Sequence, residues 1–134
     1  MPRIKHLTRS LILVLLLGLG STPAWSLDLS TKASLQAAMQ TYLDQQLVDG
    51  AFLYLDEKKG EALVLHPVTA HPMIFTMGPH YVLCFDFRDA QGKDINLDLY
   101  MARKGNGYVV FQTEVGNHQL LDKMIADGKV STTD

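Results

Sequence analysis

The sequence has one cysteine, one tryptophan, few charged residues and no excess of basic ones. Because Cys84 is the only cysteine, an intramolecular disulfide is excluded. Catalytic and cofactor signatures are also missing: there is no G-x-S-x-G, Walker loop, dinucleotide fingerprint, C-x-x-C or H-E-x-x-H. An enzyme is therefore the less favoured class, and no motif indicates a cofactor.

Residues 1–26 have the pattern of a secretory signal peptide. A basic start precedes a short apolar core at Leu11–Leu19 and small residues at the end of the segment. The apolar run is far below the roughly 20 residues that span a bilayer, so no stable membrane anchor is expected after cleavage. We expect cleavage after Ser26, or after Ala24, and a periplasmic or secreted protein.

The remaining residues, 27–134, predict a single α+β domain. They number 108, with nine basic and 14 acidic residues and a net charge of −5. This charge argues against nucleic acid as a partner and against adhesion to anionic membranes. A chain of this length can bury a core without disulfides.

Three strands of an antiparallel meander are predicted at Tyr81–Arg88, Ile95–Arg103 and Tyr108–Val115. Side chains of a strand alternate between faces, so correct pairing sets apolar residues opposite apolar ones. A three-residue first loop, residues 90–92, satisfies this rule and places Gly92 at the left-handed position. A three-residue second loop, residues 105–107, is preferred for the same reason and pairs Met101 with Phe111.

This register gives the sheet one apolar and one polar face. The apolar face carries Leu83, Phe85, Leu97, Leu99 and Phe111, and the polar face carries Cys84, Asp86, Asp98, Tyr100 and Glu114. Asp98 lies opposite Glu114, and like charges in that position are unfavourable, so water, a cation or a proton is needed between them. A solvated face and a cation or ligand site both remain open.

Further strands are predicted at Ala51–Asp56, Ala62–Leu65 and Met73–Met77, which gives a four- to five-stranded meander. Pro67 and Pro72 indicate an edge, a bend or a crossover between the last two. A three-residue loop at residues 78–80 would pair Phe75 with Leu83 and keep Phe75 on the apolar face.

Two helices are predicted to accompany this sheet. From Lys32, capped by Ser30 or Thr31, apolar residues recur at three- and four-residue steps as far as Leu47, and Asp49-Gly50 ends the helix. Its apolar stripe needs a partner, which the apolar sheet face provides. A short helix follows at residues 117–127, and a frayed end at residues 129–134.

Soft metal ligands gather in one stretch, at His71, Met73, Met77, His80 and Cys84. Thioether, imidazole and thiolate groups together suit Cu(I). The register opposes a single site, because it points Met73 and Met77 into the core and Cys84 away from it. His71, His80 and Cys84 are the candidate metal ligands, and an inert buried thiol or a dimer cross-link are alternatives for Cys84.

A second candidate is the acidic face, formed by Asp86, Asp98, Glu114 and Tyr100. Two carboxylates beside a tyrosine could perform acid/base chemistry if desolvated, or bind a divalent cation through oxygen ligands. They could equally form an interaction face for a protein or small molecule. His66, His71 and His118 are expected to be exposed if they bind nothing.

A long N-terminal helix followed by a curved meander, with the hairpin F-D-F-R-D-A-Q-G-K at Phe85–Lys93, resembles the cystatin-like and NTF2-like α+β folds over Thr31 to Val115. The resemblance implies a helix across the concave sheet face. It also implies a ligand cavity beneath that helix in some members and protein contacts through the sheet in others.

These observations favour an exported, non-enzymatic binding or interaction module of unknown ligand. A sheet edge or the acidic face would contact its protein or small-molecule partner, and a homodimer through an edge or the outer face is one form of such contact. The alternatives are a periplasmic metal-binding protein and an NTF2-like enzyme with a helix–sheet pocket.

Overall fold

The computed structural model describes residues 26–133. The predicted leader lies outside this part except for Ser26, and no helix within it is both long and apolar enough to cross a membrane. The elements, in chain order, are α1 (Leu29–Gln46), β1 (Leu47–Val48), β2 (Ala51–Asp56), β3 (Glu61–Met77), β4 (His80–Arg88), β5 (Asp94–Lys104), β6 (Gly107–Val115), α2 (His118–Ala126) and β7 (Ser131–Thr132).

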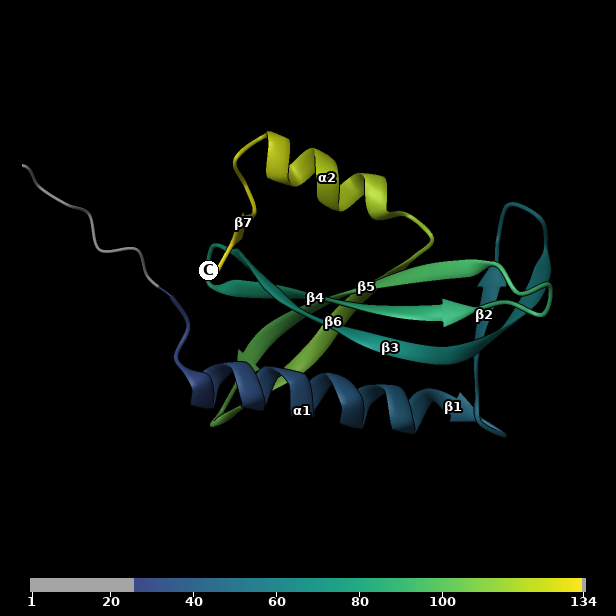
Figure 1. Ribbon diagram of the computed structural model, residues 1–134, viewed down its shortest axis with the longest axis horizontal. Coiled ribbons are helices and arrows are strands. Elements are labelled where there is room, and N and C mark those ends of the chain that lie inside the picture. Colours follow the sequence, from purple (N-terminus) through teal and green to yellow (C-terminus); the bar gives the residue numbers. More distant parts are fainter. Residues whose placement is uncertain (1–25, 134) are drawn as a thin grey trace, which may run out of the picture.

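The strands form one antiparallel meander in the order β1-β2-β3-β4-β5-β6, and β7 pairs with β3. Helix α1 lies along one side of the sheet and α2 lies on the other (Figure 1). The predicted α+β class is confirmed, with an N-terminal helix on the sheet and a short C-terminal helix. The prediction of four to five strands was too low, since six strands make up the meander.

Helix α1 begins earlier than predicted and ends earlier too. Its N-cap is Asp28, whose Oδ1 accepts a hydrogen bond from the Thr31 backbone N–H at 2.7 Å, so the predicted Ser30 or Thr31 cap is wrong. Asp49 and Gly50, with φ of 50° and 79°, do not cap the helix. They form the two-residue turn that joins β1 to β2, where paired left-handed residues match the strand twist.

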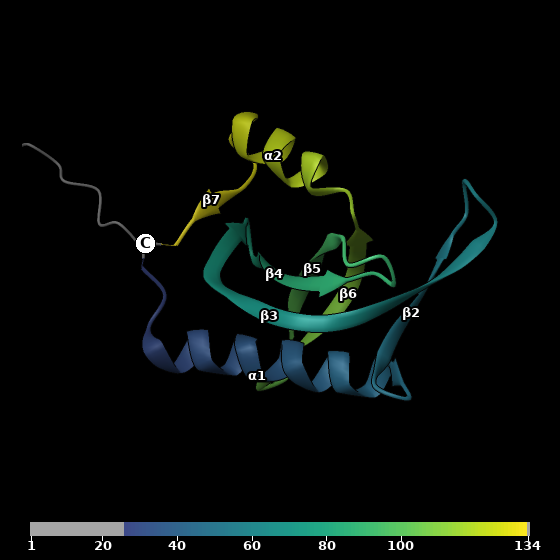
Figure 2. The same ribbon diagram turned by 45° about the vertical axis from the view of Figure 1, so that its right-hand side comes forward.

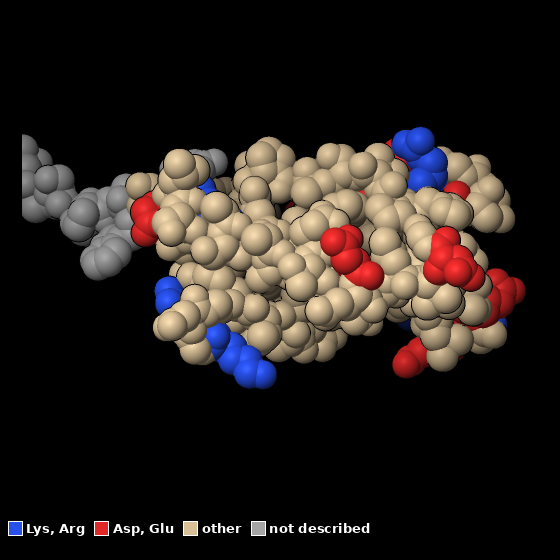
Figure 3. All heavy atoms as spheres, turned by 90° about the horizontal axis from the view of Figure 1, so that it is seen from below, with Lys and Arg blue, Asp and Glu red and all other residues tan. Residues whose placement is uncertain are grey.

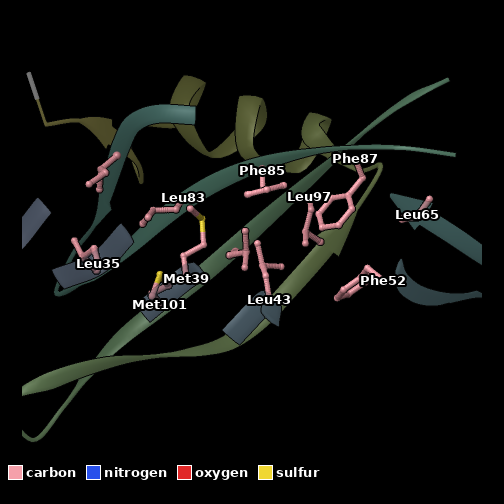
Figure 4. Close-up of a cluster of buried hydrophobic side chains, with 12 residues drawn as sticks. Leu35, Met39, Leu43, Phe52, Leu65, Leu83, Phe85, Phe87, Leu97 and Met101 are labelled. Atoms are coloured by element: carbon pink, nitrogen blue, oxygen red, sulfur yellow. The ribbon is translucent and has the colours of Figure 1, made fainter. Parts of the chain in front are cut away.

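The predicted packing of α1 on the sheet is confirmed. Leu35, Met39 and Leu43 are at most 2% exposed and face the apolar sheet side chains, including Leu83 and Leu97 (Figure 4). Phe52 and Leu65 extend this core from β2 and β3, and Phe87 is completely buried in it. The space between α1 and the sheet is thus occupied by side chains.

The β4–β5 hairpin has the predicted register. Leu83 pairs with Leu99 and Phe85 with Leu97, and Gly92 adopts φ of 81° in the connecting loop. Beyond the last strand pair, Arg88 with Asp94, the Asp89 N–H donates to the Lys93 carbonyl at 2.9 Å, which closes the predicted three-residue loop at residues 90–92. Glycine pays no steric cost at the left-handed position of this loop.

The β5–β6 hairpin differs from the prediction at its turn. Lys104 pairs with Gly107, so the loop has two residues and not three. A β-bulge then inserts Phe111, and Met101 pairs with Val110 instead of Phe111. The bulge restores the predicted pairing of Leu97 with Val115 but turns Phe111 away from α1. Phe111 is 51% exposed and contacts the rings of Tyr100 and His80.

The β3–β4 turn also has two residues, because Met77 pairs with His80. Phe75 therefore pairs with Val82, and Ile74 takes the predicted place of Phe75 opposite Leu83. A one-residue change of register moves every side chain to the other face. Phe75 and Met77 accordingly lie on the α2 side, which corrects the predicted loop at residues 78–80.

Strand β3 spans 17 residues and is bent. Its pairing with β4 shifts between Pro67 and Thr69 and again between Ala70 and Ile74, around the two prolines. The first part pairs with β2, and together they project as a hairpin arm at one end of the molecule (Figure 2). The prolines thus mark a bend, one of the three predicted alternatives.

The face away from α1 has its own core. Phe75, Val82, Cys84 and Tyr100 on the sheet pack against Leu121 of α2 and against Val130. The chain end predicted to fray is tied down as far as Thr133, whose hydroxyl donates to the Ile74 carbonyl at 3.0 Å. This face is therefore covered by α2 and by Val130, and the interpretation as a solvated face does not hold for its centre.

We predict that the α1–sheet core dominates stability. Leu43→Ala should lower the free energy of unfolding by about 2–5 kcal/mol, because it leaves a cavity in a packed core. Leu29→Ala is the matched control on the same helix, since Leu29 is 83% exposed, and its effect should stay within about 0.5 kcal/mol. Urea unfolding followed by circular dichroism measures both, and equal losses would contradict the prediction.

Candidate functional site

Three polar side chains meet between the sheet and α2: Cys84 of β4, Asp98 of β5 and His118 of α2. Cys84 and Asp98 are direct cross-strand partners on the face that α2 covers. His118 is the first residue of α2, and its Nδ1 lies 3.2 and 3.3 Å from the two Asp98 carboxylate oxygens. One ligand atom from each residue lies within 4.8 Å of the other two.

Asp98 has no exposed surface. A buried carboxylate is costly unless hydrogen bonds and opposite charges compensate it. His118 donates to it from α2, and the Cys84 thiol donates from the neighbouring strand. The buried carboxylate thus links the helix to the sheet.

Cys84 is a poor nucleophile in this setting. Burial, reinforced by the hydrogen bond to Asp98 and by the Asp98 charge, raises the pKa of the Cys84 thiol well above its usual range. The reactive form of cysteine is the thiolate. Asp98 rather than His118 is the acceptor for this thiol, so the trio lacks the cysteine–histidine pairing that activates a nucleophile.

Tyr100 lies two residues from Asp98 on the same covered face and is 4% exposed. Its hydroxyl is buried and has no hydrogen-bond partner among the described residues. Burial, followed by the negative charges of Asp98 and Glu114, raises the pKa of Tyr100 to about 12. The hydroxyl therefore stays protonated and has an unused hydrogen-bonding capacity.

The predicted clash between Asp98 and Glu114 is relieved by separate partners. The two residues are paired across β5 and β6, as expected. Asp98 is bonded to His118, whereas Glu114 accepts from Asn117 Nδ2 at 3.2 Å and Gln112 Nε2 at 3.3 Å. The four residues predicted as an acidic face therefore do not form one exposed patch.

A second histidine–carboxylate pair lies on the same side of the sheet. His71 Nε2 donates to Asp86 Oδ2 at 2.7 Å, and Asn96 Nδ2 donates to Asp86 Oδ1 at 3.3 Å. Burial opposes ionisation of Asp86, but the hydrogen bonds from His71 and Asn96 outweigh it and lower the pKa of Asp86.

The predicted metal ligands are distributed over different places. His71 is bonded to Asp86, and His80 stacks edge-on against Phe111 with a centroid distance of 5.4 Å. Only Cys84 belongs to the one group of three potential ligands that meets within the described residues. His118, the residue that sequence reasoning missed, completes that group. One feature of the sequence pointed to His118. The predicted register pairs Asp98 with Glu114 near the end of β6, and His118 follows four residues after Glu114 at the start of the next helix.

Two surface hollows flank strand β6. A cleft of about 560 Å³ lies between the hairpin arm and the end of β6, and Tyr54, Lys58, Leu63 and Ile95 are among the residues that line it. A groove of about 360 Å³ runs between α1 and the start of β6, and is lined by Ala38, Thr41, Tyr42, Gln45, Tyr108, Val109 and Val110.

Comparisons of the chain with protein-family models, with curated proteins and with solved structures give no match. Its function is therefore inferred from the geometry of its own residues.

We predict that Cys84 resists alkylation until α2 moves. Leu121→Ala should accelerate modification by iodoacetamide more than about tenfold, because losing a buried leucine costs about 2–5 kcal/mol and 1.4 kcal/mol is a factor of ten. Leu120→Ala, at a neighbouring residue that is 36% exposed, is the control and should react like the unaltered protein. Mass spectrometry under native conditions gives the rates, and fast modification of the unaltered protein would refute the prediction.

We predict that the Asp86 pair adds stability that acid removes. Because folding lowers the pKa of Asp86 below its ordinary value of 3.8, its contribution is present above that pH and is lost as the pH falls through the folded pKa. Asp86→Asn should therefore show a smaller loss of unfolding free energy between about pH 5 and about pH 2.

Urea unfolding across this pH range measures the effect of Asp86. His71→Gln should change the pH dependence in the same direction, since it removes the first of the hydrogen bonds that lower the pKa. The double variant should show the same pH dependence of the unfolding free energy as Asp86→Asn alone. Additive effects of the two substitutions would show that they do not act through one pair.

Proposed function

We propose that the protein is an exported, non-enzymatic interaction module, and that its partner adds an extended segment to the free edge of β6. An incoming strand would use the main-chain groups of that edge for affinity and the adjoining hollows for side-chain specificity. The observation that carries the proposal is a nine-residue sheet edge that no described strand pairs, with a groove beside its first half.

Strand β6 ends the sheet on one side, and no described strand pairs with its outer edge. Its nine residues, G-Y-V-V-F-Q-T-E-V, include no proline and no lysine, and one charge, Glu114. Natural edge strands usually carry proline, lysine or other charged residues, which prevent pairing with another chain. Val109 and Phe111 are 38% and 51% exposed, so the edge also offers apolar contact. The one blunting device present is the bulge at Phe111, which leaves the first half of the strand regular.

The groove between α1 and β6 supports the same proposal. It runs beside Tyr108, Val109 and Val110, where an added strand would lie, and its far wall is the Ala38–Gln45 face of α1. Few charged side chains lie along the middle of the surface on the α1 side of the molecule (Figure 3). A partner with apolar side chains at alternate positions would fit this edge and groove.

A non-enzymatic role is supported by the side chains that occupy the space between α1 and the sheet. The space under α1, where an NTF2-like enzyme would hold its substrate, contains the packed side chains of Leu35, Met39 and Leu43. The helix across the curved sheet is in keeping with a cystatin-like architecture that makes its contacts at the sheet surface. Export rests on the leader pattern of residues 1–26.

Site-specific photocrosslinking tests the proposal. A benzophenone amino acid placed at Val109 should give a discrete crosslinked product in cells that express the full chain, because Val109 lies on the edge where the partner strand pairs. The control position is Val68, which is 48% exposed and lies on β3 away from both hollows. Electrophoresis and mass spectrometry identify the products.

A product of twice the chain mass would identify the partner as a second copy of this protein, and a different mass would identify another protein. Both outcomes support edge pairing if Val68 does not give the same product. No product at Val109, or the same product from both positions, would refute it.

A further inference from the structure

We infer that Cys84, Asp98 and His118 form a binding site for a zinc ion between the sheet and α2. The inference does not depend on the β6 edge. It rests on the donor set, on the spacing of the three ligand atoms and on two further polar groups placed around them.

The donors are a thiol, a carboxylate and an imidazole from three different elements, β4, β5 and α2. Zinc binds cysteine sulfur, histidine nitrogen and aspartate oxygen at about 2.0–2.3 Å, and sites with three protein ligands keep a fourth position open. Calcium and magnesium prefer oxygen ligands, which a thiol and an imidazole do not supply. Copper(I) prefers soft ligands, whereas the central ligand here is a carboxylate.

The three ligand atoms, which lie within 4.8 Å of one another, must draw together to tetrahedral spacing when zinc binds. Zinc–ligand bonds of this length place neighbouring ligand atoms of a tetrahedral site about 3.3–3.7 Å apart. The Asp98 oxygens already lie 3.2 and 3.3 Å from His118 Nδ1, and all three ligand atoms lie within 4.8 Å of one another. The Cys84 thiol proton, which is hydrogen-bonded to Asp98, would be released to solvent as zinc binds.

Two groups around the trio fit a metal site. The other ring nitrogen of His118, Nε2, lies 3.7 Å from Asp122 Oδ1, and metal-bound histidines commonly direct that nitrogen to a carboxylate. The Tyr100 hydroxyl is buried, lacks a described partner and lies two residues from Asp98 on the same sheet face, which leaves a polar group there for a ligand to satisfy. An unsatisfied buried hydroxyl is costly unless something completes its hydrogen bonding.

A metal ion would reach the three ligands from the solvent side, past His118. Its side chain is 45% exposed while Asp98 is fully buried, so an ion can contact the imidazole from solvent before it reaches the inner ligands. His118 is also on α2, which is held against the sheet mainly through Leu121 and Met124.

Cobalt(II) titration of the protein, purified from cells that express the full chain, tests the inference, because cobalt substitutes for zinc and reports on its ligands by absorbance. We expect a sulfur-to-cobalt charge-transfer band that appears with one equivalent of Co²⁺ and disappears when Zn²⁺ displaces it. Cys84→Ser should abolish the band. His118→Gln should weaken the apparent affinity more than about tenfold, since even groups that only orient a ligand cost 10–100-fold.

His71→Gln is the matched control, because it removes a histidine bonded to a carboxylate on the same sheet face and should leave the affinity unchanged. Thermal melting without metal checks that each variant folds. His118→Gln decides the matter if Cys84→Ser does not fold, since His118 is half exposed. The inference is overturned by the lack of a charge-transfer band, by an unchanged affinity of His118→Gln, by an equal loss in His71→Gln, or by binding of Cu⁺ alone.

Discussion

The side-chain alternation of the β4–β5 hairpin determines the arrangement of everything packed around it. Gly92 fixes the register of this hairpin, and each strand then directs one set of side chains to α1 and the other to α2. Residues 82–85 of β4 are buried on both faces as a result. A slip of one position would exchange Leu83 and Phe85 with Cys84 and Val82, and neither helix would meet a matching surface.

The two covered faces differ in chemistry. The buried side chains toward α1 are all apolar, mainly leucine, methionine and phenylalanine, and their stabilising energy comes from burial. The side toward α2 surrounds a buried carboxylate with apolar groups, so α2 must be placed where His118 can reach Asp98. A buried charge gives little net stability, but it penalises any other placement of the helix. The smaller helix is thus positioned by a polar requirement and the larger one by shape and area.

The parts of the fold that could be predicted are those where the alternation of apolar residues leaves one solution. The β4–β5 register followed from pairing Phe85 with Leu97, and the α1 stripe followed from helical spacing. The bulge at Phe111 could not be predicted, because the sequence is compatible both with a longer loop and with a short loop plus one inserted residue. The turn at Gly78-Pro79 was misjudged because Ile74 and Phe75 are both apolar, so either could face the core.

The candidate site was less accessible to sequence reasoning than the fold. Cys84 and Asp98 could be placed as cross-strand partners from the register alone. His118 is 20 residues beyond Asp98, and its approach depends on how the chain turns after β6, which periodicity does not report. His80 is nearer to Cys84 in the sequence than His118 is, but its ring contacts Phe111.

The sequential order of the strands in the sheet has a consequence for how the chain folds. Every strand from β1 to β6 pairs with its neighbour in sequence, so each hairpin closes a short loop at small entropic cost and can form before the next. Low contact order of this kind speeds folding. The contact between α1, which precedes the first strand, and β6, the last strand of the meander, closes a loop that contains the whole meander, so it has a large closure entropy. The hairpins of the meander can therefore form from local contacts, and packing of α1 against the sheet then stabilises its curvature.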